Sequence, residues 1–107
     1  MPLAKLDAFE KEAVDLAAFA KALAHPARIL ILQHLAGRGE VPCMDIVAAV
    51  PLSQPACSRH INDLRKAGLL KSRTHGNNVF FRIDESALRQ FCQSMNQTLH
   101  PNSKPDV

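Results

Sequence analysis

The sequence predicts a mainly α-helical domain with a small β-hairpin wing, a winged helix-turn-helix, and three observations lead to that fold. Apolar residues recur at helical spacing near both ends of the chain. Between them lie a short apolar helix, a proline-containing turn and a longer basic helix. Two short β-type runs follow, joined by a sequence typical of a hairpin tip. A chain of 107 residues fits one such domain.

The first predicted helix begins near Leu6, from which apolar residues recur every three or four positions as far as Leu23. Such a stripe is wide enough to pack against a partner helix. A second helix follows, with His25 as its N-cap. Pro26 suits its first turn, because the N–H that proline lacks is not needed there. This second helix is expected to end at Gly37.

The helix-turn-helix unit is predicted at about residues 42–67. A short third helix starts near Pro42, and a turn leads from it to the fourth helix. Ser53 is the expected N-cap of this fourth helix, because its hydroxyl can accept a hydrogen bond from a free backbone N–H of the first turn. Gly68 supplies the left-handed residue that ends the helix.

The wing is predicted at about residues 69–83, as two strands joined by the sequence HGNN. Side chains alternate along a strand, so one of two sets in the second run closes the core. These sets are Val79, Phe81 and Ile83 on one side and Phe80 and Arg82 on the other.

Asp84 is expected to cap a final helix, whose apolar stripe consists of Leu88, Phe91, Cys92, Met95 and Leu99. The single domain is therefore expected to span residues 1–100. Residues 101–107 form a polar tail that is expected to fray.

Positive charge is concentrated on one part of the chain. Residues 1–24 hold three lysines against four acids, whereas residues 54–83 hold six arginines and lysines against Asp63 alone, a net of +5. A nucleic-acid footprint requires such a concentration, because cations near phosphates release condensed counterions. A solvated basic face without a partner would carry the same charges.

Several other classes of protein find less support in the sequence. The longest nearly apolar run, around residues 29–32, is far shorter than the roughly 20 residues that span a bilayer. Acidic residues near the N-terminus argue against an export signal. Three widely separated cysteines do not form a disulfide framework, which favours the reducing cytoplasm.

Residues 52–73 are compatible with a reactive site around Cys57 and His60 or with a surface that lies on a polyanion. On a helix, Cys57 shares a face with Ile61 and Leu64, which favours packing as a small hydrophobe. A nucleophilic pair would need an exposed thiol and a third group that orients the imidazole. Neither is indicated, so no catalytic residue is predicted and the surface is the preferred interpretation.

The other side of the fourth helix carries groups that bind base edges or phosphates. The predicted DNA-contacting residues are Ser53, Gln54, Ala56, Ser58, Arg59 and His60 at this helix, and Arg73, His75 and Asn77 on the wing. The wing residues would reach the phosphate backbone or the minor groove. Two alternatives stay open: His60 packs against the third helix, or the wing is a solvated hairpin.

The stretches ALAHPARILILQHL, LSQPACSRHINDLRKAGLLKSR and HGNNVFFRI together resemble the ArsR/SmtB-type bacterial transcriptional regulators. The resemblance covers about residues 20–83 and is specific only as a combination of motifs. It implies a homodimeric repressor joined through its first and last helices, which binds a palindromic operator on double-stranded DNA. It also implies an effector that releases the DNA, commonly a metal ion held by cysteines, histidines or carboxylates.

The sequence departs from the metal-site patterns of that family. Members with a thiolate site carry C-x-C at the start of the third helix, where this chain has Pro42, Cys43 and Met44, and proline cannot ligate a metal. A second family site lies between the last helices of the two subunits. At its offsets this chain has Asp84, Ser86, Gln97 and His100. That set is incomplete, so no metal and no cofactor are predicted.

Some relatives sense oxidants or sulfur species through paired cysteines, and Cys43 and Cys92 are the candidate pair in this chain. A disulfide requires their Cα atoms to lie within about 7 Å. Cys43, in the first turn of a helix, would gain some help from the helix dipole in lowering its pKa. Apolar packing of both thiols, an organic effector, or no small effector are the alternatives.

A second function class also stays open, a winged helix used for protein–protein contact or dimerisation without a DNA target. Such an adaptor would present an apolar patch on its recognition face. The polar and cationic residues predicted there favour DNA instead.

Overall fold

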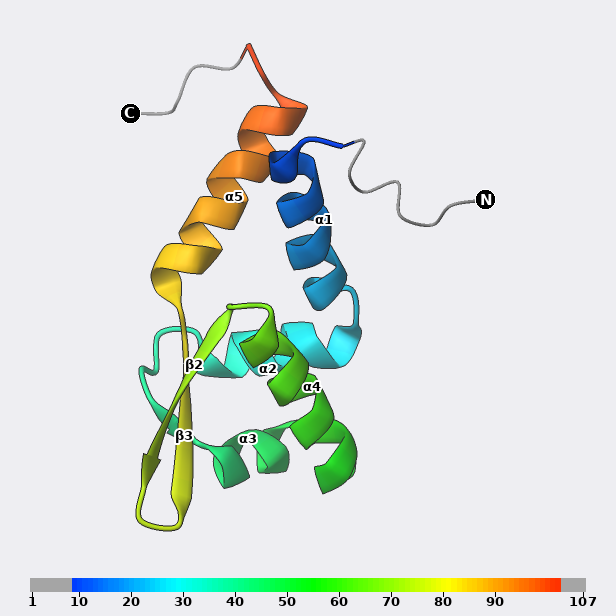
Figure 1. The fold of residues 1–107 in the computed structure, drawn as a ribbon. Helices are drawn as coiled ribbons and strands as arrows, with labels where there is room; N and C mark the ends of the chain where they lie inside the picture. Colours follow the sequence, from blue (N-terminus) through cyan, green and yellow to red (C-terminus); the bar gives the residue numbers. More distant parts are fainter. Residues whose placement is uncertain (1–8, 103–107) are drawn as a thin grey trace.

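The computed structural model describes residues 9–102. The described residues form five helices and one small antiparallel sheet (Figure 1). The elements are α1 (Lys11–Leu23), α2 (Pro26–Leu35), β1 (Val41–Pro42), α3 (Cys43–Ala49), α4 (Gln54–Lys66), β2 (Leu70–His75), β3 (Asn78–Ile83) and α5 (Glu85–Leu99). The predicted fold class and element order are confirmed. The expectations for Leu6 and for residues 103–107 of the tail lie outside the described residues.

The predicted helix caps are confirmed. The side chains of His25, Ser53 and Asp84 each accept a hydrogen bond from a backbone N–H in the first turn of the following helix, at 3.0, 3.3 and 3.1 Å. Gly68 follows α4 with a φ of 88°, as expected for the residue that ends it. Gly37 also has a positive φ, but α2 ends two residues before it, at Leu35.

Strand β1 was not predicted. Val41 and Pro42 pair with Phe81 and Phe80 of β3, so the third helix begins at Cys43 rather than at Pro42. The sheet order is β1-β3-β2, which puts the short strand on an edge, where proline is tolerated. A two-residue strand has no periodicity that a sequence pattern could reveal.

The hairpin is longer than its predicted tip implied. Strands β2 and β3 pair as far as His75 and Asn78, so only Gly76 and Asn77 form the turn. Gly76 has a φ of 62°, and a glycine with positive φ at the first of two central positions is typical of a type II′ turn.

The core lies between α2, α3, α4 and the sheet. Cys57, Ile61 and Leu64 are buried there, which confirms the predicted inner face of α4. Phe81 and Ile83 belong to the same cluster, so their set closes the core, whereas Val79 of that set is 36% exposed. The largest fully buried side chains elsewhere are Ile31, Leu35, Ile46 and Leu69.

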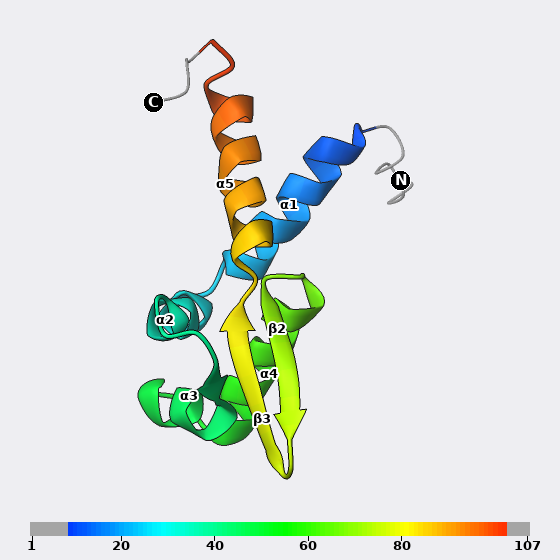
Figure 2. The ribbon, with the colours of Figure 1, turned by 90° about the vertical axis from the view of Figure 1, so that its left-hand side faces the viewer.

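Helices α1 and α5 lie together at the end of the molecule opposite to the hairpin tip and the start of α4 (Figures 1 and 2). The rings of Phe19 and Phe91 join the two helices, with their centroids 5.6 Å apart. No residue of α5 is buried, and Leu99 is 64% exposed. Among the described residues, no helix has the length and apolar character needed to cross a membrane.

Candidate nucleic-acid interface

Helix α4 and its N-cap carry most of the residues predicted to contact DNA. Ser53, Gln54 and Arg59 are exposed, whereas Ala56 and Ser58 are half-buried. The first turns of α4 and the hairpin tip lie at the same end of the molecule (Figure 1). His75 and Asn77 are exposed at that tip. The structure therefore brings these seven predicted residues to one end of the fold.

Arg73 on β2 is engaged within the protein. Its Nε and Nη2 donate to both carboxylate oxygens of Glu40, over 2.9 to 3.1 Å, and its guanidinium lies 5.1 Å from the centre of the Phe80 ring. The hydrogen bond from Arg73 lowers the pKa of Glu40, and the same bond raises the pKa of Arg73. The side chain of Arg73 remains 51% exposed, so this ion pair lies at the surface.

His60 packs against α2, and not against the third helix. Its Nδ1 accepts a hydrogen bond from Nε of Arg28 over 3.1 Å, and its ring lies 4.3 Å from that of His25, measured between centroids. Burial, and then the neighbouring His25 and Arg28, lower the pKa of His60. His60 therefore faces the N-terminus of α2, apart from the seven residues at the end of the fold.

Asn62 and Arg65 of α4 are absent from the predicted contact set, yet both line a hollow of about 230 Å³ beside Ser58. Cys43, Ile61, Val79 and Phe81 form the rest of its wall, so the hollow lies between α4 and the wing. Nη2 of Arg65 donates to Oδ1 of Asn62 over 2.8 Å. Their offsets of four and seven residues from Ser58 were the signal that placed them on one helical face.

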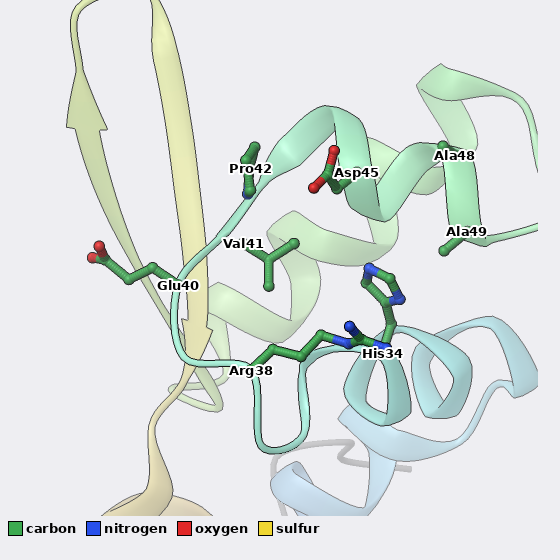
Figure 3. Close-up of a pocket in the computed structure, with 8 residues that line it drawn as sticks. All are labelled: His34, Arg38, Glu40, Val41, Pro42, Asp45, Ala48 and Ala49. Atoms are coloured by element: carbon green, nitrogen blue, oxygen red, sulfur yellow. The ribbon is translucent and has the colours of Figure 1, made fainter.

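A larger open hollow, of about 650 Å³, lies between the end of α2, the following loop and α3. Figure 3 shows the imidazole of His34 and the guanidinium of Arg38 beside one another, with Asp45 on the α3 side and Glu40 pointing away. Its wall thus contains both basic and acidic side chains. The residues present do not select a ligand of one charge or class.

The three cysteines lie in different environments. Cys57 is fully buried, Cys43 is half-buried and Cys92 is exposed. Burial raises the pKa of the Cys43 and Cys57 thiols, so the expected help from the helix dipole at Cys43 is outweighed. Helices α3 and α5 lie at opposite ends of the molecule in Figures 1 and 2, which argues against a Cys43–Cys92 disulfide within one chain.

Comparison with known proteins agrees with this geometry. A helix-turn-helix domain family model matches residues 23–73. The biofilm growth-associated repressor of Agrobacterium fabrum is 32% identical over 90 residues, which cover 84% of this chain and 76% of the repressor. An ArsR-like transcriptional regulator from a Rhodococcus species has 26% identity and a TM-score of 0.71 over 80% of each chain. The chain belongs to the ArsR/SmtB-type family of transcriptional regulators.

A further structure shows the same fold. It comes from Mycobacterium bovis and is described as the homodimeric winged helix-turn-helix DNA-binding domain of a possible ArsR-family transcriptional regulator. It has 24% identity and a TM-score of 0.66, and covers 100% of this chain and 95% of its own. With these relatives, the chain is a DNA-binding transcriptional regulator.

Asp84, at one metal-site position of the family, and Cys43, between the two positions of the thiolate site, both have a role in the fold. Asp84 caps α5 and lies 3.8 Å from Nζ of Lys71, and Cys43 packs against the core. Within residues 9–102, no group of three or more histidine, cysteine, aspartate or glutamate side chains is placed to hold a metal ion.

The Glu40–Arg73 pair leads to a first testable outcome. Glu40→Gln is expected to raise affinity for DNA by roughly two- to fivefold, because Arg73 is then free to reach a phosphate and a nearby negative charge is removed. Fluorescence anisotropy with a labelled duplex measures the change. Glu12→Gln on α1 removes the same charge far from the wing and serves as the control. Equal affinities of Glu40→Gln and wild type would show that Arg73 stays apart from DNA.

Proposed function

We propose that this regulator is a homodimeric repressor, which binds a palindromic operator in double-stranded DNA through α4 and the wing and is released by an effector. The observation that carries the proposal is the arrangement of α4. Its apolar face is buried in the core, while its polar and cationic side and the wing tip lie at one end of the molecule. The chemistry of that end suits a polyanion with exposed base edges.

Helix α4 is the proposed recognition helix, which enters the major groove. Gln54 and Ser58 offer hydrogen-bonding groups to base edges, and the guanidinium of Arg59 suits a guanine or a phosphate. Ser53 and Ala56 lie in the same first turns. His75 and Asn77 at the wing tip are placed to approach the adjacent backbone or minor groove. Arg73 joins them when its pair with Glu40 opens.

Helices α1 and α5 are the proposed dimer surface. The apolar stripe of α5 is half-buried at Leu88, Phe91 and Met95 and exposed at Cys92 and Leu99. A stripe with no buried member is expected to be covered by another helix, because exposed apolar area is unfavourable in water. A second copy would double the recognition helices and match a two-fold symmetric operator.

The alternative is a winged helix that contacts another protein and has no DNA target. Apart from Pro55, the exposed residues of α4 are polar or charged, whereas an adaptor would present an apolar patch there. Catalysis is also not part of the proposal, because Cys57 is fully buried and His60 is engaged with Arg28. A chromosomal operator as partner places the protein in the cytoplasm.

Arg59→Ala is expected to weaken binding to a native duplex from upstream of the protein's own gene by about 1–3 kcal/mol, because one base or phosphate contact is lost. Anisotropy titrations at two salt concentrations, beside a scrambled duplex, measure the effect. Arg89→Ala on α5 removes the same charge at the other end of the molecule. The assignment of this face would be wrong if Arg59→Ala unfolded the protein or bound like wild type.

Cys92→Glu is expected to shift the protein from dimer to monomer, because it puts a carboxylate into the proposed α1–α5 dimer surface. Sedimentation equilibrium measures the mass, and a loss of tenfold or more in association is expected. Gln93→Glu adds the same charge to the neighbouring exposed position and is the matched control. If both variants remain dimers, the dimer surface lies elsewhere.

The effector is proposed to be a thiol-reactive species that acts through the cysteines named by the sequence, Cys43 and Cys92, in a disulfide between two copies of the chain, because α3 and α5 lie at opposite ends of one copy. Cys92 is the exposed member and lies on the proposed dimer surface. Diamide, which oxidises two thiols to a disulfide, is expected to change operator affinity severalfold in the wild type and not in Cys92→Ser. Cys43→Ser tests whether the half-buried thiol takes part. Equal affinity of oxidised and reduced wild type would contradict redox sensing.

A further inference from the structure

Arg28 on α2 joins three helices through one guanidinium group. Its Nη1 donates to the carbonyl oxygen of Ala22 on α1 over 3.1 Å. Its Nε donates to Nδ1 of His60 over 3.1 Å, and its Nη2 donates to Oδ2 of Asp63 over 2.7 Å. The side chain of Arg28 is only 17% exposed. A guanidinium is a rigid planar fork, so these bonds together fix α4 relative to α1 and α2.

The two acceptors on α4 lie beside the proposed DNA-reading residues. His60 and Asp63 are three positions apart and share the side of α4 that faces α2. Arg59 directly precedes His60, and Asn62 directly precedes Asp63. A rotation of α4 about its own axis would therefore break the fork and, at the same time, turn Arg59 away from its place at the groove. Recognition of bases depends on the rotation of α4, because bidentate contacts require that a side chain and a base edge are aligned.

We propose that Arg28 is a positioning residue for DNA recognition, which holds α4 at the rotation that its DNA-facing side chains require, through His60 and Asp63. This inference rests on the proposed use of α4 as the recognition helix. It assigns to His60 a role inside the protein rather than at the DNA surface.

The link between Arg28 and His60 requires a neutral imidazole. Nδ1 accepts the hydrogen bond only while it carries no proton. The charged or titratable groups that face His60 are His25 and Arg28 on the α2 side and Arg59 and Asp63 on α4 itself. Burial, His25, Arg28 and Arg59 lower the pKa of His60, and only Asp63 raises it. With a proton on Nδ1, the N–H of His60 and the Nε–H of Arg28 would both be donors facing each other, and the hydrogen bond between them would break.

The sign of the pH effect follows from that lowered pKa. Folding favours the neutral form, so the contribution of His60 is complete above its ordinary pKa of 6.5 and is lost as pH falls through the lower folded value. Preference for operator over scrambled DNA is expected to fall over the same range. The ratio of the two affinities is the proper readout, because protonation elsewhere raises affinity for any DNA.

The test is anisotropy with a labelled duplex from upstream of the protein's own gene and a scrambled duplex of the same composition. Arg28→Lys keeps the charge and loses the fork, and Arg28→Gln loses both. Near neutral pH, each is expected to lower affinity for the native duplex by about tenfold, the value of one charge-assisted hydrogen bond. Affinity for the scrambled duplex and the salt dependence should stay unchanged, because Arg28 is not a phosphate contact.

A second variant leaves Arg28 in place. His60→Asn keeps a side-chain acceptor near the position of Nδ1, and that acceptor does not titrate. The wild type is expected to lose its preference for the native duplex on acidification, and His60→Asn is expected to keep it. His34→Asn makes the same replacement on α2, outside α4 and the wing, and should show the same loss as the wild type.

Three results would overturn the inference: wild-type affinity in Arg28→Lys, a salt dependence lowered by about one phosphate contact in Arg28→Gln, or an unchanged pH effect in His60→Asn. If circular dichroism shows that the Arg28 variants do not fold, the His60→Asn comparison decides. If the wild-type protein binds both duplexes equally, the proposed function itself is wrong. The wild-type measurement alone shows this, without any variant.

Discussion

Burial of one face of α4 is the constraint on which the rest of the structure depends. Cys57, Ile61 and Leu64 are fixed in the core against α2, α3 and the sheet. With 3.6 residues per turn, this burial forces Arg59 outward, whereas Gln54 is exposed because it begins the helix. The helix cannot hide its polar side without exposing its apolar one. The same hydrophobic contacts that stabilise the fold therefore orient the surface that we propose contacts DNA.

The two ends of the molecule differ in how far they bury their apolar residues. At the end formed by α4 and the wing, a closed core supports exposed polar side chains. At the other end, α1 and α5 touch through Phe19 and Phe91, yet α5 buries none of its residues within one chain. A helix with that stripe gains little from a single neighbour, because most helical stability comes from packing an apolar face. The core of one chain is thus closed at one end, whereas the apolar stripe of α5 stays uncovered at the other, where we propose that a second copy packs.

Local signals in the sequence predicted most of this fold. The caps at His25, Ser53 and Asp84 and the glycine that ends α4 act over three or four residues, so the sequence alone reveals them. Strand β1 and the pairing of Arg73 with Glu40 were not predictable, because each joins segments more than thirty residues apart. The inner position of His60 depends on Arg28 in the same way. Sequence patterns identify faces of elements, whereas partners across elements require the fold.

Arg73 and Arg28 both pair with a carboxylate, but they differ in burial, and burial decides whether the guanidinium can exchange its partner. Arg73 and Glu40 form a bidentate pair at the surface, where water screens the interaction and an approaching phosphate can replace the carboxylate. Arg28 also pairs with a carboxylate, but it is 17% exposed and uses all three sides of its fork within the protein. A phosphate that drew Arg28 away from Asp63 would also leave His60 and the carbonyl oxygen of Ala22 without the donor that Arg28 provides. The guanidinium of Arg73 on the wing can therefore exchange its partner at the surface. The hydrogen bonds of Arg28, by contrast, hold the orientation of α4 from within the protein.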